Sequence, residues 1–264
     1  MLLAGCQGIE SDEDGDEVDS QSSEDALAGC TYPNAGHKGG GTIVSDSGCF
    51  PWGNKAVHYV SKGAGKFDNS SIGTVPTPAK AGDYEILALS ASHGGDTTTE
   101  VDTYFDPQKM KAQGFKGIGV KGETDKKIEL WVRKNNGETK IFTPDKAVEY
   151  NVLVLKGADI SLNLGGIVKH RVEDSGKFWE LPLQSGSDFN VLAYFGDDPV
   201  SVTDTHGGEL VFNQWGYGDG DSLNVMFYKP DATPGYKLPK TVSIYNDQPQ
   251  GQQYVGILAN FPKN

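Results

Sequence analysis

The sequence predicts an all-β fold, namely an antiparallel β-sandwich of the jelly-roll kind, over residues 31–264. The chain has 264 residues, which suffices to bury a sizeable core, and its 35 glycines and 13 prolines follow no collagen-like period. Many short runs of alternating apolar and polar residues are separated by turn-rich spacers, and no long amphipathic pattern interrupts them. These features favour short paired strands joined by turns, in one sandwich or in two stacked ones.

The expected strands follow one another along the whole body. Their alternating runs are 55–60 (KAVHYV), 83–90 (DYEILALS), 99–106 (TEVDTYFD), 115–120 (FKGIGV), 127–134 (KIELWVRK), 148–155 (VEYNVLVL), 160–164 (ISLNL), 187–195 (SDFNVLAYF), 208–215 (GELVFNQW), 221–228 (DSLNVMFY), 240–245 (KTVSIY) and 253–258 (QYVGIL). The segment 106–113 (DPQKMKAQ) is expected to form a short helix. A loose echo recurs in DYEILAL, EYNVLVL and DFNVLAY, and its unequal spacings indicate shared strand chemistry and not a repeat array.

Residues 1–30 differ from the body in composition. The chain carries a net charge of −13, nine of its acidic residues lie between Glu10 and Asp25, and no lysine or arginine precedes Lys38. Such a segment has too little apolar surface to fold, so we expect a disordered acidic tether that its own charge extends. The remaining body is only mildly acidic, which argues against nucleic acid as a partner because binding needs a cationic stripe.

A four-residue motif opens this segment. LAGC at 3–6 resembles the lipobox of bacterial lipoproteins, in which Cys6 would be diacylated and anchor an exported protein to the membrane. The glutamine after Cys6 would then favour the outer membrane. Only five residues precede Cys6, and LAGC recurs at 27–30, so either the chain starts late in its signal or the match is accidental. No apolar run long enough to span a membrane is present.

The chain has three cysteines. If Cys6 is lipidated, Cys30 and Cys49 remain, and in an oxidising compartment they would form a disulfide at the entry to the body. The alternative is two free thiols.

A second resemblance concerns the body. Residues 105–138 (FDPQKMKAQGFKGIGVKGETDKKIELWVRKNNGE) resemble a block of the galactose-binding-like sandwiches that are common among bacterial carbohydrate-binding modules. The preceding residues 53–67 (GNKAVHYVSKGAGKF) are similar to the segment before that block. The resemblance covers about half the body and implies a sandwich that binds a polysaccharide or other glycan.

Alternation along the strands sorts candidate ligand-binding side chains from core ones. In 127–134 the apolar set alternates with polar residues and an indole, and the same holds in 209–215 and 221–228. Aromatic rings interleaved with amides and charges suit a sugar, because a pyranose stacks on a ring while polar groups bind its hydroxyls. The residues expected to face solvent and bind carbohydrate are Glu129, Trp131, Arg133, Asn213, Trp215, Asn224 and Tyr228, whereas Trp179 is expected in the core.

Clustered carboxylates on turns favour calcium as a possible bound ion. The candidate ligands are Asp197, Asp198, Asp204, Asp219 and Asp221. Asp-Gly pairs are also ordinary turn formers, so a structural role is the alternative. The run around Gly15 also resembles a calcium loop, although the tether explains it better.

Two enzymatic functions and one structural function remain as alternative hypotheses. Glu100 and Asp102 resemble the nucleophile and assisting acid of family-16 glycoside hydrolases, but Tyr104 replaces the general acid/base. A polysaccharide lyase would need a tyrosine or histidine base, for which the candidates are His58, His93, His170 and His206. A structural or adhesive surface protein without a glycan ligand is the third possibility.

Overall fold

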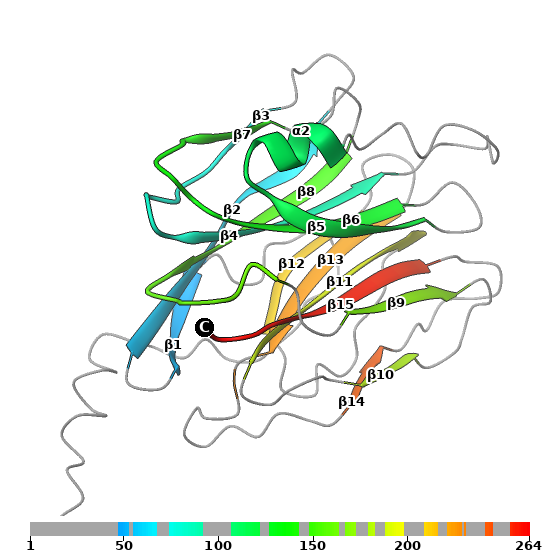
Figure 1. Cartoon of the computed structure of the whole chain (residues 1–264). Coiled ribbons are helices and arrows are strands. Elements are labelled where there is room, and N and C mark those ends of the chain that lie inside the picture. The colour runs from blue at the N-terminus through cyan, green and yellow to red at the C-terminus, as the bar shows by residue number, and fades with distance from the viewer. Residues whose placement is uncertain are drawn as a thin grey trace, which may run out of the picture.

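The computed structural model describes fourteen stretches of the chain (Figure 1). The described residues are 47–52, 55–67, 74–91, 107–121, 127–142, 148–163, 167–172, 179–182, 188–197, 209–215, 221–228, 230, 241–244 and 254–264. The acidic segment 1–30 therefore lies outside them, and its prediction as a tether stays untested.

Two large sheets stack on one another (Figure 1). The six-stranded sheet has the order β1-β2-β8-β4-β6-β5 and the five-stranded sheet the order β12-β13-β11-β15-β9. Their strands are β1 (Ser47–Trp52), β2 (Lys55–Phe67), β4 (Tyr84–Ala91), β5 (Lys116–Lys121), β6 (Lys127–Lys134), β8 (Val148–Lys156), β9 (Ile167–Val172), β11 (Phe189–Asp197), β12 (Glu209–Trp215), β13 (Asp221–Tyr228) and β15 (Tyr254–Phe261). Every pairing among the described strands is antiparallel, which confirms the predicted all-β sandwich.

Smaller elements flank the two large sheets. The two-stranded sheets are β3 (Thr74–Pro76) with β7 (Lys140–Phe142), and β10 (Trp179–Pro182) with β14 (Thr241–Ile244). In Figure 1, β3, β7 and the helix α2 (Pro107–Ala112) lie above the six-stranded sheet, and β10 and β14 lie below the five-stranded one. The predicted helix is thus confirmed. Proline opens it, where a missing N–H costs nothing, and Gly114 with φ +83° closes it.

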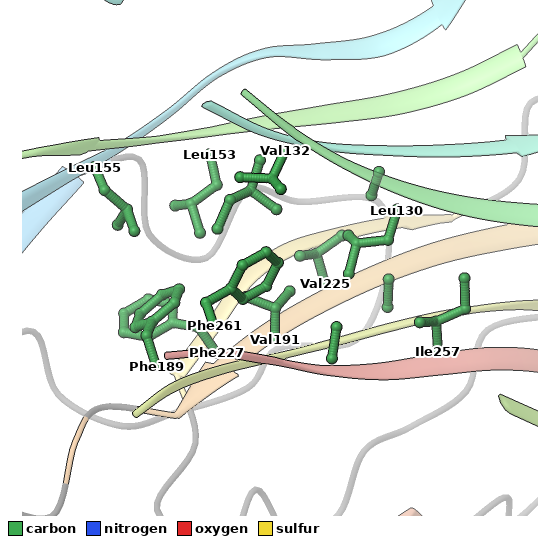
Figure 2. Close-up of a cluster of buried hydrophobic side chains, with 14 of the residues drawn as sticks. Leu130, Val132, Leu153, Leu155, Phe189, Val191, Val225, Phe227, Ile257 and Phe261 are labelled. Carbon is green, nitrogen blue, oxygen red and sulfur yellow. The ribbon is translucent and has the colours of Figure 1, made fainter. Parts of the chain in front are cut away.

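The main core fills the space between the facing sides of the two sheets (Figure 2). Because side chains alternate along a strand, every second residue of each strand contributes to it. Its aromatic centre joins β1 and β2 to the other sheet: the Phe50 and Phe189 rings stack 5.7 Å apart, and Tyr59 meets Phe227 edge-on at 4.7 Å. A second core lies between the outer face of the six-stranded sheet and its covering elements, where Met110, Phe115 and others pack against the sheet.

Among the described residues, the segment beginning at Ile160 does not form the strand expected there. Residues 160–164 were predicted as a strand, but among their described members only Ile160 makes a bridge, to Lys263. The backbone N–H of Ser161 donates to the carbonyl of Pro262, and Asn264 donates to the carbonyl of Asp159. This segment therefore ties down the end of the chain described here and does not extend a sheet. No helix among the described residues is long and apolar enough to cross a bilayer.

Candidate functional site

Strand β6 places Glu129, Trp131 and Arg133 on the outer face of the six-stranded sheet, opposite the core face, as alternation predicts. The prediction that they face solvent is wrong. Trp131 is 3% exposed, Arg133 1% and Glu129 2%, because Met110 of α2, the following Phe115 and the flanking strands cover this face. The sequence pattern gave no sign of that third layer. These residues form no open platform for a sugar.

Arg133 instead links the six-stranded sheet to the elements that cover its outer face. Its Nε donates to Glu85 Oε2 on the neighbouring strand β4, and its Nη1 donates to Glu138 Oε2 at 2.5 Å. Nη1 and Nη2 also reach the carbonyls of Gln113 and Lys140, at 3.2 and 3.4 Å. The guanidinium is thereby occupied by groups that follow α2 and that lead into β7, which indicates a structural role.

Glu129 lies in a comparable internal network. Its Oε2 accepts a hydrogen bond from Trp131 Nε1 at 2.7 Å, and its Oε1 lies 3.1 Å from Lys127 Nζ. Burial raises the pKa of the Glu129 carboxyl, while the charge of Lys127 and the two hydrogen bonds partly offset this effect.

This raised pKa has a measurable consequence for stability. The folded state holds its proton on Glu129 to higher pH than the unfolded chain does, so Glu129 lowers stability as pH rises from the ordinary glutamate pKa through the raised one. We expect Glu129→Gln to lose this pH dependence. In urea unfolding across pH 4–8, the stability of the variant relative to the parent should therefore rise with pH. A constant difference over that range would contradict the assignment.

The other candidate residues lie on the five-stranded sheet. In β13, Asn224 and Tyr228 point away from the core residues Leu223, Val225 and Phe227, as predicted. Both are nevertheless 0% exposed, so their predicted exposure to solvent is wrong. Further layers cover this sheet too.

The register of this sheet brings polar residues into one row. Asn213 of β12 pairs with Asn224, Asn224 pairs with Tyr194 of β11, Tyr194 with Gly256 of β15, and Gly256 with His170 of β9. Of these, the side chains of Asn224 and Tyr194 are among the described ones. Trp215, two residues beyond Asn213, pairs with Ser222, but its side chain, like that of Trp179, lies outside the described part.

A second polar row lies nearby and was missed by the sequence analysis. Asn190 pairs with Tyr228 on one side and with Asn260 on the other, and Asn260 Nδ2 donates to Asn190 Oδ1 at 3.4 Å. The signal was available in DFNVLAYF, where Asn190 and Tyr194 alternate with core residues. The outer face of this sheet thus carries two rows with amides and phenols, which both donate and accept hydrogen bonds, and between them an apolar row of Met226, Leu192 and Leu258.

Only part of the candidate calcium site lies within the described structure. Asp197 and Asp221 are register partners at the ends of β11 and β13. Asp198, Asp204 and Asp219 fall outside the described residues, as do the side chains of the other two. Within the described part, no three His, Cys, Asp or Glu residues are grouped so as to hold a metal ion.

The remaining candidates are mostly outside the description. Glu100, Asp102, Tyr104, His93 and His206 are in undescribed segments, while His58 is exposed on β2. Cys49 is buried and disulfide-bonded. Cys6 and Cys30 lie outside the described residues, so the expected pairing with Cys30 and the lipidation of Cys6 stay predictions.

The described strands form an antiparallel β-sandwich that buries several charged and amide side chains on the outer faces of its two sheets, among them Glu85, Arg133 and Asn224. Comparison with protein-family models, with curated proteins and with solved structures finds no match to this chain.

Proposed function

We propose that this protein is an exported binding module that recognises carbohydrate at the edge of its five-stranded sheet, along β12. The observation that carries the proposal is the row running from Asn213 through Asn224 and Tyr194 to His170. Asn213 is the member of this row on the edge strand, and an asparagine amide can both donate to and accept from a sugar hydroxyl.

The roles within this site follow from position. Strand β12 ends the order of the five-stranded sheet, so Asn213 and Trp215 stand at its edge, where a ligand can approach. Asn224 pairs with Asn213, is fully buried and would position it from within the sheet, whereas Tyr228 pairs with Asn190 away from this edge. In the proposed complex, the Trp215 ring stacks on a pyranose and the Asn213 amide binds its hydroxyls. Glu129, Trp131 and Arg133 take no part, since the fold itself uses their polar groups.

Three further features belong to this proposal. Lipidated Cys6 and the acidic tether would hold the sandwich at the outer membrane, and a Cys30–Cys49 disulfide would fix the chain where it enters the body. A calcium ion bound around Asp197 and Asp221 would order the adjoining loops. The register pairing of these two aspartates supports that placement.

A glycan array tests the site. We expect Trp215→Ala to abolish binding of the parent's preferred polysaccharide, because it removes the stacking surface. The matched control is Trp131→Phe, a conservative change at the buried indole, which should leave the binding profile unaltered. Repeating the array in a calcium chelator tests whether the ion contributes.

Three results would contradict the proposal. Retained binding by the Trp215 variant would exclude this face, and absence of any glycan binding by the parent would favour a structural or adhesive role. Release of reducing ends or unsaturated uronates from the bound polysaccharides would instead assign a glycosidase or lyase.

A further inference from the structure

The two large sheets share one strand order. In the six-stranded sheet, β5-β6-β4-β8-β2 are neighbours in that sequence, and in the five-stranded sheet β12-β13-β11-β15-β9 are neighbours. If each strand of the first set is matched to the strand seven places later in the chain, the two orders are identical. Only β1, at the outside of the six-stranded sheet, has no counterpart among the described strands.

The match extends to the small sheets. In the first set, β3 precedes β4 in the chain and pairs with β7, the strand between β6 and β8. In the second set, β10 precedes β11 and pairs with β14, the strand between β13 and β15. The register also agrees, because β3 ends at Pro76 and β10 at Pro182, and these prolines pair with the first residues of β7 and β14. All seven strands of each set thus have a counterpart.

Registers in the large sheets agree residue by residue. Glu85 of β4 pairs with Arg133 and with Val154, and Asn190 of β11 pairs with Tyr228 and with Asn260. Matching Glu85 to Asn190 therefore matches their partners as well. The preceding residues, Tyr84 and Phe189, both face the main core, and each follows an aspartate. Two of the three echoes in the sequence, DYEILAL and DFNVLAY, occupy these equivalent strands.

One pair of contacts between the two sheets is reciprocal. Strand β6 lies against β15 and strand β8 against β13. In the strand match given above, β6 corresponds to β13 and β8 to β15. Exchanging the two sets of strands therefore turns the contact between β6 and β15 into the contact between β13 and β8. Such an exchange is expected of an isologous interface, in which two equivalent surfaces meet about a twofold axis. Among the described strands, the contacts of β6 with β11, of β5 with β15 and of β2 with β12 have no counterpart of comparable extent, so the twofold relation of the two faces is incomplete.

We infer that the body is an internal duplication: two equivalent seven-stranded units, 55–156 and 167–261, that pack as a dimer within one chain. The inner face of each unit is an interaction surface, and its partner is the other unit of the same chain. Each unit buries on the other the apolar side that it cannot cover alone. Under this inference, two of the echoes lie at equivalent positions of the two units, whereas the third echo, EYNVLVL in β8, lies at a different position.

Cleavage between the units tests this inference. A protease site is inserted between Leu164 and Gly165 in the full chain, outside the described residues, and the folded protein is cut, denatured in urea without reductant and dialysed. We expect the two fragments to recover a 1:1 complex in size-exclusion chromatography, with the far-ultraviolet circular dichroism of the uncut protein.

The matched control carries the same site between Pro144 and Asp145, in the connection from β7 to β8 within the first unit. Its fragments should recover at least tenfold less complex, because the cut separates β8 from the strands with which it forms its unit. Equal recovery from both cuts would overturn the inference. So would fragments of the first cut that refold as separate monomers, since the inner faces would then need no partner. Neither result bears on glycan binding, which is measured separately.

Discussion

Replacing Arg133 by methionine is expected to lower the free energy of unfolding by about 3–5 kcal/mol, the usual cost of removing one partner from a buried ion pair. Arg133 is 1% exposed and its partner Glu85 is 0% exposed, so the variant leaves in the interior a carboxylate to which the amide of Asn135 still donates a hydrogen bond. Urea unfolding at neutral pH measures the loss, with the midpoint and slope fitted together.

A double variant tests whether the loss of stability comes from the unpaired charge. Arg133→Met combined with Glu85→Leu removes both charges and should recover most of the loss, since two apolar side chains of similar size need no charge partner. In the second unit the equivalent pair is Asn190 and Tyr228, which shows that the fold holds without an ion pair there. If the double variant were as unstable as the single one, Arg133 would act through its packing on Phe115, 4.6 Å from the guanidinium carbon, and not through charge.

Replacing Phe227 by alanine is the second substitution with a large expected effect, also about 3–5 kcal/mol. Its ring is 0% exposed and lies 4.7 Å from Tyr59, 5.2 Å from Phe189 and 6.1 Å from Phe50, measured between ring centroids. The variant would leave a cavity where the two units meet, at a point that cannot collapse without moving both sheets. Thermal and urea unfolding should show the loss in a single transition.

Phe142→Ala supplies the matched control. Phe142 is 54% exposed at the end of β7, so its truncation should change stability by less than about 0.5 kcal/mol. Equal effects of the two substitutions would contradict the assignment of Phe227 to the main core.

The sequence allowed the faces of the strands to be predicted, but not what covers them. Alternation separates Leu130 and Val132 from Trp131 and Arg133 correctly, because a strand has a period of two whatever its surroundings. It also suggested that a face carrying Glu and Arg meets water. That step failed because Arg133 pairs with Glu85 of the neighbouring strand and Glu129 pairs with Lys127, beneath the elements that cover this face. The pairing across strands depends on a register that one strand does not reveal.

Five strands were missed for a related reason. β1 (SGCFPW), β3 (TVP) and β10 (WELP) contain prolines, which normally signal turns, and β3, β7 and β10 have only three or four residues. Each of the three proline-bearing strands has only one neighbour in its sheet, where a missing N–H is tolerated. β9 (IVKHRV) lacks a clear alternation. Tertiary pairing and not local preference therefore determines these elements.

The edge formed by β5 has a consequence for how copies of this protein meet at high concentration. β5 is the last strand of its sheet and begins and ends with lysine, so two such edges cannot align without bringing like charges together. At Gly117 between them, an added Cβ would lie 2.3 Å from the Leu130 carbonyl oxygen and 2.6 Å from the Trp131 ring. A valine or isoleucine at position 117, which would raise the β-propensity of this edge strand, is therefore excluded sterically. This exclusion disfavours edge-to-edge growth of fibres along β5.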